Sequence, residues 1–295
     1  MVEPAERLRL RRRAATRGAP PALLTALLTA ALLGCGAGRA TTTQRTSAPA
    51  ADPAALATEI DRAQQTIDET AATPAELEQA GREEQLAFGL LADRRPLHRP
   101  TLARLSPAAR ASATAALRAA GALAKIVPSE HRFPRWRIIA PPPARRLLGY
   151  FRTAGTTYRI PWQYLAAIEL VETRMGRIRG LSPAGARGPM QFEPATWAEY
   201  GRGSIDSQRD SISAAARFLA ANGGRRRIGR ALFHYNPSPA YVAAVESYSG
   251  EMRRDPRAFY GYRGWQVLYR TTRGTFVLPV GYPRLRPERL PATEH

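Results

Sequence analysis

Apolar residues recur at helical spacing from about residue 52 onwards. A set spaced three or four positions apart comprises Leu56, Ile60, Ala63 and Ile67. Three start signals pair a capping side chain with proline at the first helical position, namely Asp52-Pro53, Thr73-Pro74 and Ser106-Pro107. Glu76 completes a capping box with Thr73. The pattern predicts three helices between residues 52 and 130, the second running to about Leu91 and the third to about Ile126.

The same spacing continues into the second half of the chain. Leu165, Ile168, Val171 and Met175 mark the core face of a helix over residues 162–175. Further helices are expected over residues 145–158, 211–221, 228–235 and 239–248, and one begins at Pro194. After residue 264 the pattern changes to alternating apolar and polar positions with Gly274 in a turn, which predicts a β-hairpin. The expected fold is therefore mainly α with a C-terminal β-hairpin.

The first 51 residues read as a targeting region. Arginines between Arg7 and Arg17 precede an apolar run, Ala19 to Leu33, which is shorter than the roughly 20 residues that span a bilayer. Leu32-Leu33-Gly34-Cys35 resembles the bacterial lipobox, which implies cleavage before Cys35 and attachment of diacylglycerol to its sulfur. We expect a lipoprotein signal peptide at 1–34 and a flexible tether at 35–51. A plain signal peptide followed by a buried thiol is the alternative.

Charge and cysteine content exclude several classes. The formal net charge is +20, but Lys125 is the only lysine, and Ala, Gly and Pro are abundant, as GC-rich codon usage produces. No nucleic-acid motif accompanies the charge, so we expect no nucleic-acid partner; anionic wall polymers or lipid headgroups fit it instead. Cys35 is the only cysteine, so no intramolecular disulfide forms. No His or Cys pair has metal-ligand spacing, and we expect neither a metal nor another cofactor.

Glu172 carries the candidate chemistry. It lies near the end of an apolar helix, and burial among apolar neighbours raises the pKa of a carboxyl, as a general acid requires. Gly185 and Gly188 punctuate the loop that follows and allow a tight turn and a close approach to a ligand. Gln191 in that loop is placed to hydrogen-bond a sugar hydroxyl or N-acetyl group.

These residues resemble the bacterial lytic transglycosylases with a goose-lysozyme-like catalytic domain, and lean towards their membrane-bound branch. The matching motifs, in the same order, are Glu172-Thr173, Gly185-Ala186-Arg187-Gly188-Pro189-Met190-Gln191-Phe192 and Tyr235-Asn236. The resemblance implies a lysozyme-like transglycosylase domain at 140–262. A helical region of unknown role at 52–130 precedes it, and a C-terminal β-hairpin and tail at 263–295 follow it.

The resemblance also implies roles for single residues. Glu172 acts as acid and then as base in cleaving peptidoglycan glycan strands without water, which leaves a 1,6-anhydro sugar. Ser182 and Gln191 line the sugar groove between the Glu172 helix, the glycine loop and Tyr235, whose hydroxyl points at Glu172. Tyr241 is a further groove-lining candidate. The protein is then extracytoplasmic and held at the bacterial cell membrane by lipid on Cys35.

Two carboxylates depart from the family pattern and keep alternatives open. Glu169 lies one turn before Glu172; it either raises the pKa of Glu172 by like-charge repulsion or, as we favour, pairs with an arginine. Glu193 stands where relatives carry an apolar residue, and either touches substrate or faces solvent. Glu193 or Glu169 as a second carboxylate would make the protein a hydrolytic muramidase. A non-catalytic peptidoglycan-binding scaffold is the other alternative.

Overall fold

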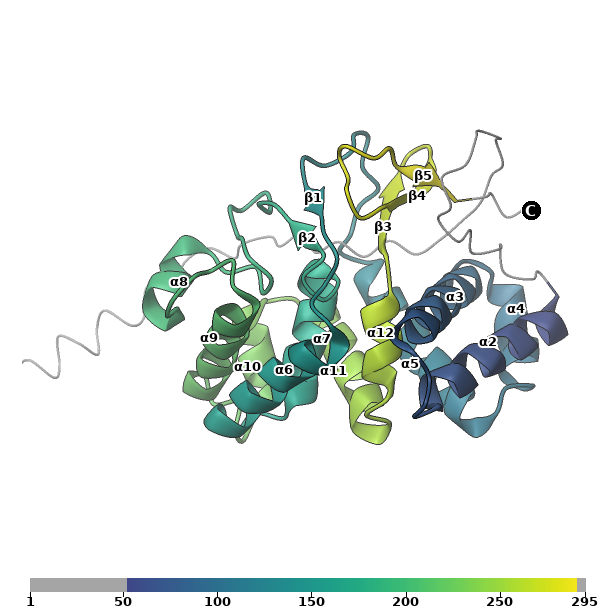
Figure 1. Cartoon of the computed structure of the whole chain (residues 1–295), viewed down its shortest axis with the longest axis horizontal. Helices are drawn as coiled ribbons and strands as arrows, with labels where there is room; N and C mark the ends of the chain where they lie inside the picture. Colours follow the sequence, from purple (N-terminus) through teal and green to yellow (C-terminus); the bar gives the residue numbers. More distant parts are fainter. Residues whose placement is uncertain (1–51, 291–295) are drawn as a thin grey trace, which may run out of the picture.

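The computed structural model describes residues 52–290, which form a mainly helical structure with two small antiparallel sheets (Figure 1). The predicted signal peptide, the lipidation site at Cys35 and the tether lie outside the described residues. The helices are α2 Pro53–Asp68, α3 Pro74–Asp93, α4 Arg95–Leu102, α5 Pro107–Leu123, α6 Ala144–Tyr158, α7 Trp162–Thr173, α8 Pro194–Tyr200, α9 Gln208–Ala221, α10 Ile228–Tyr235, α11 Pro239–Arg254 and α12 Ala258–Gly264. The mainly α prediction is confirmed.

Local capping signals fix the starts of the early helices. The Asp52 carboxylate accepts hydrogen bonds from the backbone N–H groups of residues 54 and 55, and proline follows at the first helical position of α2. Thr73 and Glu76 form the reciprocal capping box of α3. Ser106 caps α5 through its hydroxyl, which accepts a hydrogen bond from the N–H of Ala109. Each start lies where the sequence places it.

The N-terminal helices pack on the rest of the molecule through glycine contacts between α3 and α12. A Cβ on Gly81 would lie 2.3 Å from the carbonyl oxygen of Gly261 and 3.0 Å from the Cα of Gly264. The two backbones therefore touch, which only glycine permits at this position. Leu56 and Phe88 of this region belong to the same hydrophobic core as α7, whereas the strands have a separate small cluster that includes Ile138, Ile178 and Val267.

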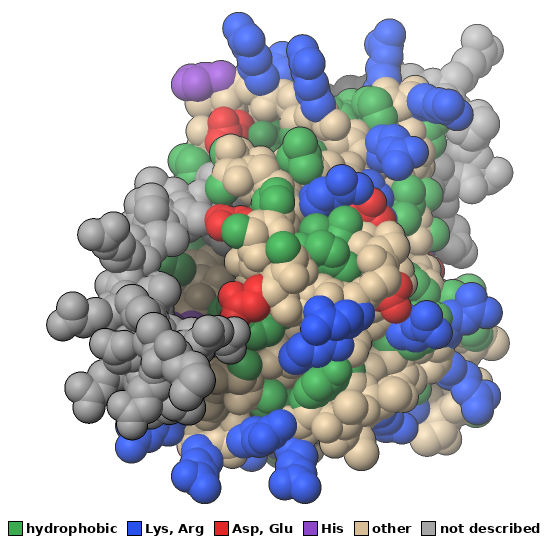
Figure 2. All heavy atoms as spheres, turned by 90° about the vertical axis from the view of Figure 1, so that its left-hand side faces the viewer, with side chains coloured by type: hydrophobic (Ala, Val, Ile, Leu, Met, Phe, Trp, Pro, Cys, Tyr) green, Lys and Arg blue, Asp and Glu red, His purple; other side chains and the backbone are tan. Residues whose placement is uncertain are grey.

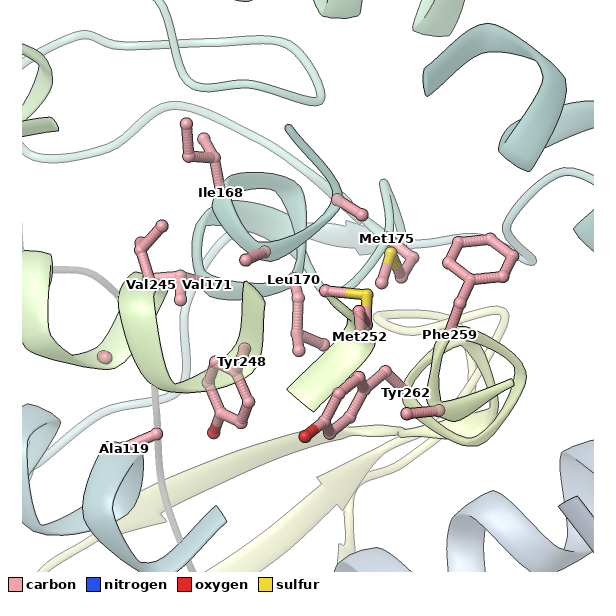
Figure 3. Packing of buried hydrophobic residues seen from close by; sticks show 14 of the residues in the cluster. Ala119, Ile168, Leu170, Val171, Met175, Val245, Tyr248, Met252, Phe259 and Tyr262 are labelled. Atoms are coloured by element: carbon pink, nitrogen blue, oxygen red, sulfur yellow. The ribbon is translucent and has the colours of Figure 1, made fainter. Parts of the chain in front are cut away.

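Helix α7 runs through the middle of that core. Every residue from Tyr164 to Thr173 is buried, so the helix has no solvent-facing side. Figure 3 shows Leu170 and Val171 of α7 packed beside Val245 and Met252 of α11. Two carboxyl groups on this helix consequently lie away from water, where their ionised forms are costly.

The strands are short and lie beside the helices. β1 Arg137–Ile138 pairs antiparallel with β2 Ile178–Arg179, and this pair joins the segment before α6 to the segment after α7. In the second sheet β3 Val267–Thr271 pairs antiparallel with β4 Gly274–Leu278, and β5 Glu288–Arg289 adds to β4. Over residues 52–290, no helix combines the length and apolar character needed to cross a membrane.

Candidate functional site

Glu172 occupies the last turn of α7 and is almost completely buried. Its residue surface is 3% exposed. Burial raises the pKa of the Glu172 carboxyl to about 8, and a hydrogen bond from Tyr241 opposes that rise only in part. The Tyr241 hydroxyl donates to Glu172 Oε1 across 2.8 Å, while Oε2 is buried with no hydrogen-bond partner. Near neutral pH the group is therefore a protonated acid with one oxygen uncommitted, as the sequence predicts.

The chain leaves α7 in an unusual backbone conformation. Arg174, Met175 and Gly176 have φ values of 54°, 57° and 75°, a run of left-handed residues that turns the chain sharply. The Thr173 hydroxyl accepts a hydrogen bond from the N–H of Gly176 at 3.1 Å and donates one to the carbonyl of Pro189 at 2.5 Å. This hydroxyl thus ties the end of the acid-bearing helix to the glycine loop.

The glycine loop itself is held from two further sides. Tyr235 Oη donates to the carbonyl of Met190 across 2.6 Å, immediately after the carbonyl that Thr173 binds. Gly188 has a φ of 79°, and a Cβ there would lie 2.1 Å from the carbonyl oxygen of Ile205, so the loop packs directly on that backbone. Two hydroxyls and one backbone contact therefore fix the loop beside the α7 terminus.

Three predicted substrate-binding residues lie on or next to this loop. Ser182 Oγ accepts a hydrogen bond from the N–H of Ala186 at 3.1 Å and closes a turn. The Gln191 amide donates to the carbonyl of Gly188 at 3.1 Å, and its backbone has a φ of 49°. Glu193 is half-buried at the N-cap of α8, where its side chain makes no capping hydrogen bond. One polar atom of Ser182 and one of Gln191 are therefore already hydrogen-bonded within the loop.

The two candidate tyrosines occupy places that differ from those expected. We expected the Tyr235 hydroxyl to point at Glu172, but it bonds the loop at Met190; Glu172 nonetheless raises the pKa of Tyr235, secondary to burial. We expected Tyr241 to line the groove, but its side chain is 0% exposed and carries the hydroxyl that bonds Glu172. The reason is tertiary, because α11 crosses α7 closely and brings position 241 under the acid.

The favoured arginine pairing of Glu169 is wrong. Within residues 52–290 its carboxyl forms no ion pair and no well-aligned hydrogen bond, and the residue is 0% exposed. Burial raises the pKa of Glu169 to about 8, against smaller lowering effects from Arg179 and from Gln208, whose amide lies beside it. The side chains of Glu169 and Gln208 both lie against Gly176. A Cβ at Gly176 would lie 1.8 Å from Gln208 Nε2 and 2.9 Å from Glu169 Oε1. Glu169 faces α9, whereas Glu172 faces α11.

The site combines the protonated carboxyl of Glu172 with the glycine loop and its polar side chains. Among residues 52–290 no three His, Cys, Asp or Glu side chains gather as metal ligands do. Comparison of the chain with protein-family models, with curated proteins and with solved structures finds no match. The geometry of the site provides a buried acid, Glu172, that accepts a hydrogen bond from Tyr241 on one oxygen, and a second buried carboxyl, Glu169, one turn earlier on α7.

Proposed function

We propose that this protein is a lytic transglycosylase that cleaves the bond between N-acetylmuramic acid and N-acetylglucosamine in peptidoglycan. The observation that carries the proposal is the state of Glu172, whose burial raises its pKa to about 8 while Oε2 keeps no partner. A carboxyl that is still protonated near neutral pH can donate to a glycosidic oxygen. The motif order and the mainly helical fold support a lysozyme-like catalytic domain.

The proposed reaction uses Glu172 twice. Its proton passes to the oxygen that bridges the two sugars, and the bond from that oxygen to the muramic C1 breaks. The Glu172 carboxylate then takes the proton of the muramic C6 hydroxyl, whose oxygen closes on C1 to give the 1,6-anhydro sugar. Tyr241 stabilises the carboxylate between these steps through its bond to Oε1. No water is consumed, so one carboxylate is enough.

A hydrolytic muramidase is the second candidate. That reaction would need a second carboxylate to act as a base or nucleophile. Glu169 is poorly suited to that role, since its own pKa is raised to about 8 and it lies against Gly176 and α9. Glu193 is better placed, since its half-buried side chain makes no capping bond beside the loop. Glu193 is therefore the residue on which the hydrolytic alternative rests.

Product chemistry separates these reactions. Purified peptidoglycan is incubated with the full chain carrying Cys35→Ser, and the released fragments are weighed by mass spectrometry. The transglycosylase releases anhydro-muropeptides, one water lighter than the reducing-end products of a hydrolase. Reducing-end products that disappear in Glu193→Gln would establish the muramidase instead. Binding to insoluble peptidoglycan without any release would leave a scaffold. The proposed lipid anchor and extracytoplasmic location need a separate test, lipid labelling that is lost in Cys35→Ser.

A further inference from the structure

Two long segments of the chain contain no acidic residue, and the fold brings them together. Residues 131–168 and residues 211–245 contain neither Asp nor Glu. Helix α6 of the first segment packs against α9 of the second. The Arg225 side chain donates a hydrogen bond through Nε to the carbonyl of Tyr158 at the end of α6, across 3.0 Å. Arginines of α6 and of the segment between α9 and α10 therefore lie near one another, whereas Arg132, Arg135 and Arg137 of the first segment lie around β1.

Six exposed arginines make up this part, which we call the basic corner: Arg145, Arg152, Arg159, Arg225, Arg226 and Arg227. Within residues 52–290 none of the six forms an ion pair. Figure 2 shows basic side chains projecting along the lower edge of the molecule, without acidic side chains among them on this face. Glu246 of α11, which lies against Gly229, borders the corner on the α10 side.

Two of these arginines form a row along α6, and a third lies at its C-terminal end. Arg145 and Arg152 are seven residues apart, or about two helical turns, so they share a face over about 10 Å, and Arg159 is the C-cap residue, with a φ of 57°. The row ends at a shallow pocket of about 450 Å³ where α6 meets α7, lined in part by Thr156 and Trp162. The Arg152 guanidinium lies over the Trp162 ring, 5.9 Å from its centroid. Cationic groups thus adjoin a half-buried indole.

We propose that the basic corner is a docking surface for the anionic phosphate headgroups of a phospholipid membrane. Guanidinium groups bind phosphate oxygens through paired N–H donors, and an adjoining indole such as that of Trp162 favours the headgroup level of a bilayer. The arginine row lies on the outer face of α6, a geometry that suits a flat charged surface. Several arginines facing one membrane add their attractions.

Most of the corner lies at the end of α7 opposite Glu172. Helix α7 begins at Trp162 beside the corner and reaches Glu172 ten residues later, a rise of about 15 Å. In Figure 1 α6, α9 and α10 lie below β1 and β2, and β2 follows α7. The end of the corner around Arg159 and Arg225 therefore lies at the opposite end of α7 from Glu172, whereas Arg145, at the start of α6, lies on the side where β1 and β2 connect to the end of α7. The docking itself does not depend on the proposed glycan cleavage.

Co-sedimentation with vesicles tests the docking surface. The full chain carries Cys35→Ser, so that no lipid is attached, and the readout is the difference between phosphatidylcholine vesicles with and without phosphatidylglycerol. The corner variant is Arg145→Gln/Arg152→Gln/Arg226→Gln. The matched control removes the same charge from exposed positions on α4 and α5, as Arg95→Gln/Arg99→Gln/Arg118→Gln.

The corner variant is expected to lose affinity for anionic vesicles by about 100-fold, because each basic residue near such a surface contributes about fivefold. The control variant is expected to stay near the unmodified chain, and thermal melts should match for all three. Equal losses in both variants would overturn the proposal, since net charge alone would then explain binding. Binding of soluble polyphosphate is measured in parallel. A corner variant that binds vesicles as well as the unmodified chain but loses polyphosphate binding would also overturn the proposal, in favour of a polymer partner.

Discussion

Tyr241 Oη and Glu172 Oε1 lie 2.8 Å apart, and the hydroxyl donates to the carboxyl within the buried interface of α11 and α7. Burial pushes the pKa of Glu172 up to about 8, and this hydrogen bond is the cause that opposes it. The pair thus sets how readily the acid releases and recovers its proton. Since Tyr241 is completely buried, its effect on a substrate passes through Glu172.

Replacing Tyr241 with Phe should therefore change the pH profile of peptidoglycan cleavage. Without the donor the pKa of Glu172 rises further, by about one unit for a bond to a charged group, so the alkaline limb of activity moves to higher pH. The maximal rate should fall about tenfold, because the carboxylate formed during turnover loses its stabilisation. Tyr248→Phe is the control, since Tyr248 is equally buried on α11. An unmoved alkaline limb in Tyr241→Phe would contradict this role.

For Tyr235 we predict a change in KM rather than in the pH profile. Its hydroxyl holds the Met190 carbonyl at 2.6 Å, so Tyr235→Phe should loosen the glycine loop and raise KM severalfold. The alkaline limb should stay in place, because the Glu172–Tyr241 bond is intact. The same pH titration of kcat and KM measures both variants. A limb that moves in Tyr235→Phe but not in Tyr241→Phe would restore the arrangement expected from the family resemblance.

Buried carboxyls should make the fold less stable as pH rises. The folded pKa values of Glu169 and Glu172 are each raised from 4.5 to about 8, so the folded state holds more protons than the unfolded chain between those values. Their contribution to stability is fully present below pH 4.5 and is lost as pH rises through about 8. Glu169→Gln should consequently stabilise the fold at pH 9 by a few kcal/mol and change little at pH 4. Denaturant midpoints at both pH values measure this, and equal shifts at both would contradict it.

The contact of α3 with α12 yields a stability prediction with an internal control. Gly81→Ala would place a Cβ 2.3 Å from the carbonyl oxygen of Gly261 and should cost about 1–3 kcal/mol. Gly121→Ala lies in helix α5 with no atom within 4 Å of the new Cβ and should stabilise by about 1 kcal/mol. Thermal melts distinguish the two signs. A neutral Gly81→Ala would mean that α3 and α12 separate at little cost.

Local signals in the sequence were sufficient for the helices that begin with a cap and a proline. They failed for α4, which contains Pro96 and Pro100 and has no side-chain cap, and for α12, whose Gly261 and Gly264 weaken a helix. Both form through packing, since α4 contacts α2 and the glycines of α12 allow α3 to approach. Tertiary contacts of this kind leave no periodic trace in the sequence.

The candidate site, too, could be predicted from the sequence only in part. The raised pKa of Glu172 was predictable, because an apolar helix buries whatever carboxyl it carries. The partner of that carboxyl was not, since positions 235 and 241 are both tyrosines near the same helix junction and only the crossing of α11 over α7 selects one. Glu169 was mispredicted because Arg174 bonds the carbonyl of Leu170 and Arg177 pairs with Glu78, while Arg179 acts on Glu169 only through its charge.

The measurement that tests the central claim most directly compares Glu172→Gln with Glu169→Gln on purified peptidoglycan. Both variants remove a buried carboxyl from α7, so Glu169→Gln controls for the loss of such a group from this helix. If Glu172 is the acid, Glu172→Gln lowers release of anhydro-muropeptides by about 10²–10⁴-fold, while Glu169→Gln keeps most of the activity. Full activity in Glu172→Gln, or an equal loss in both variants, would contradict the account.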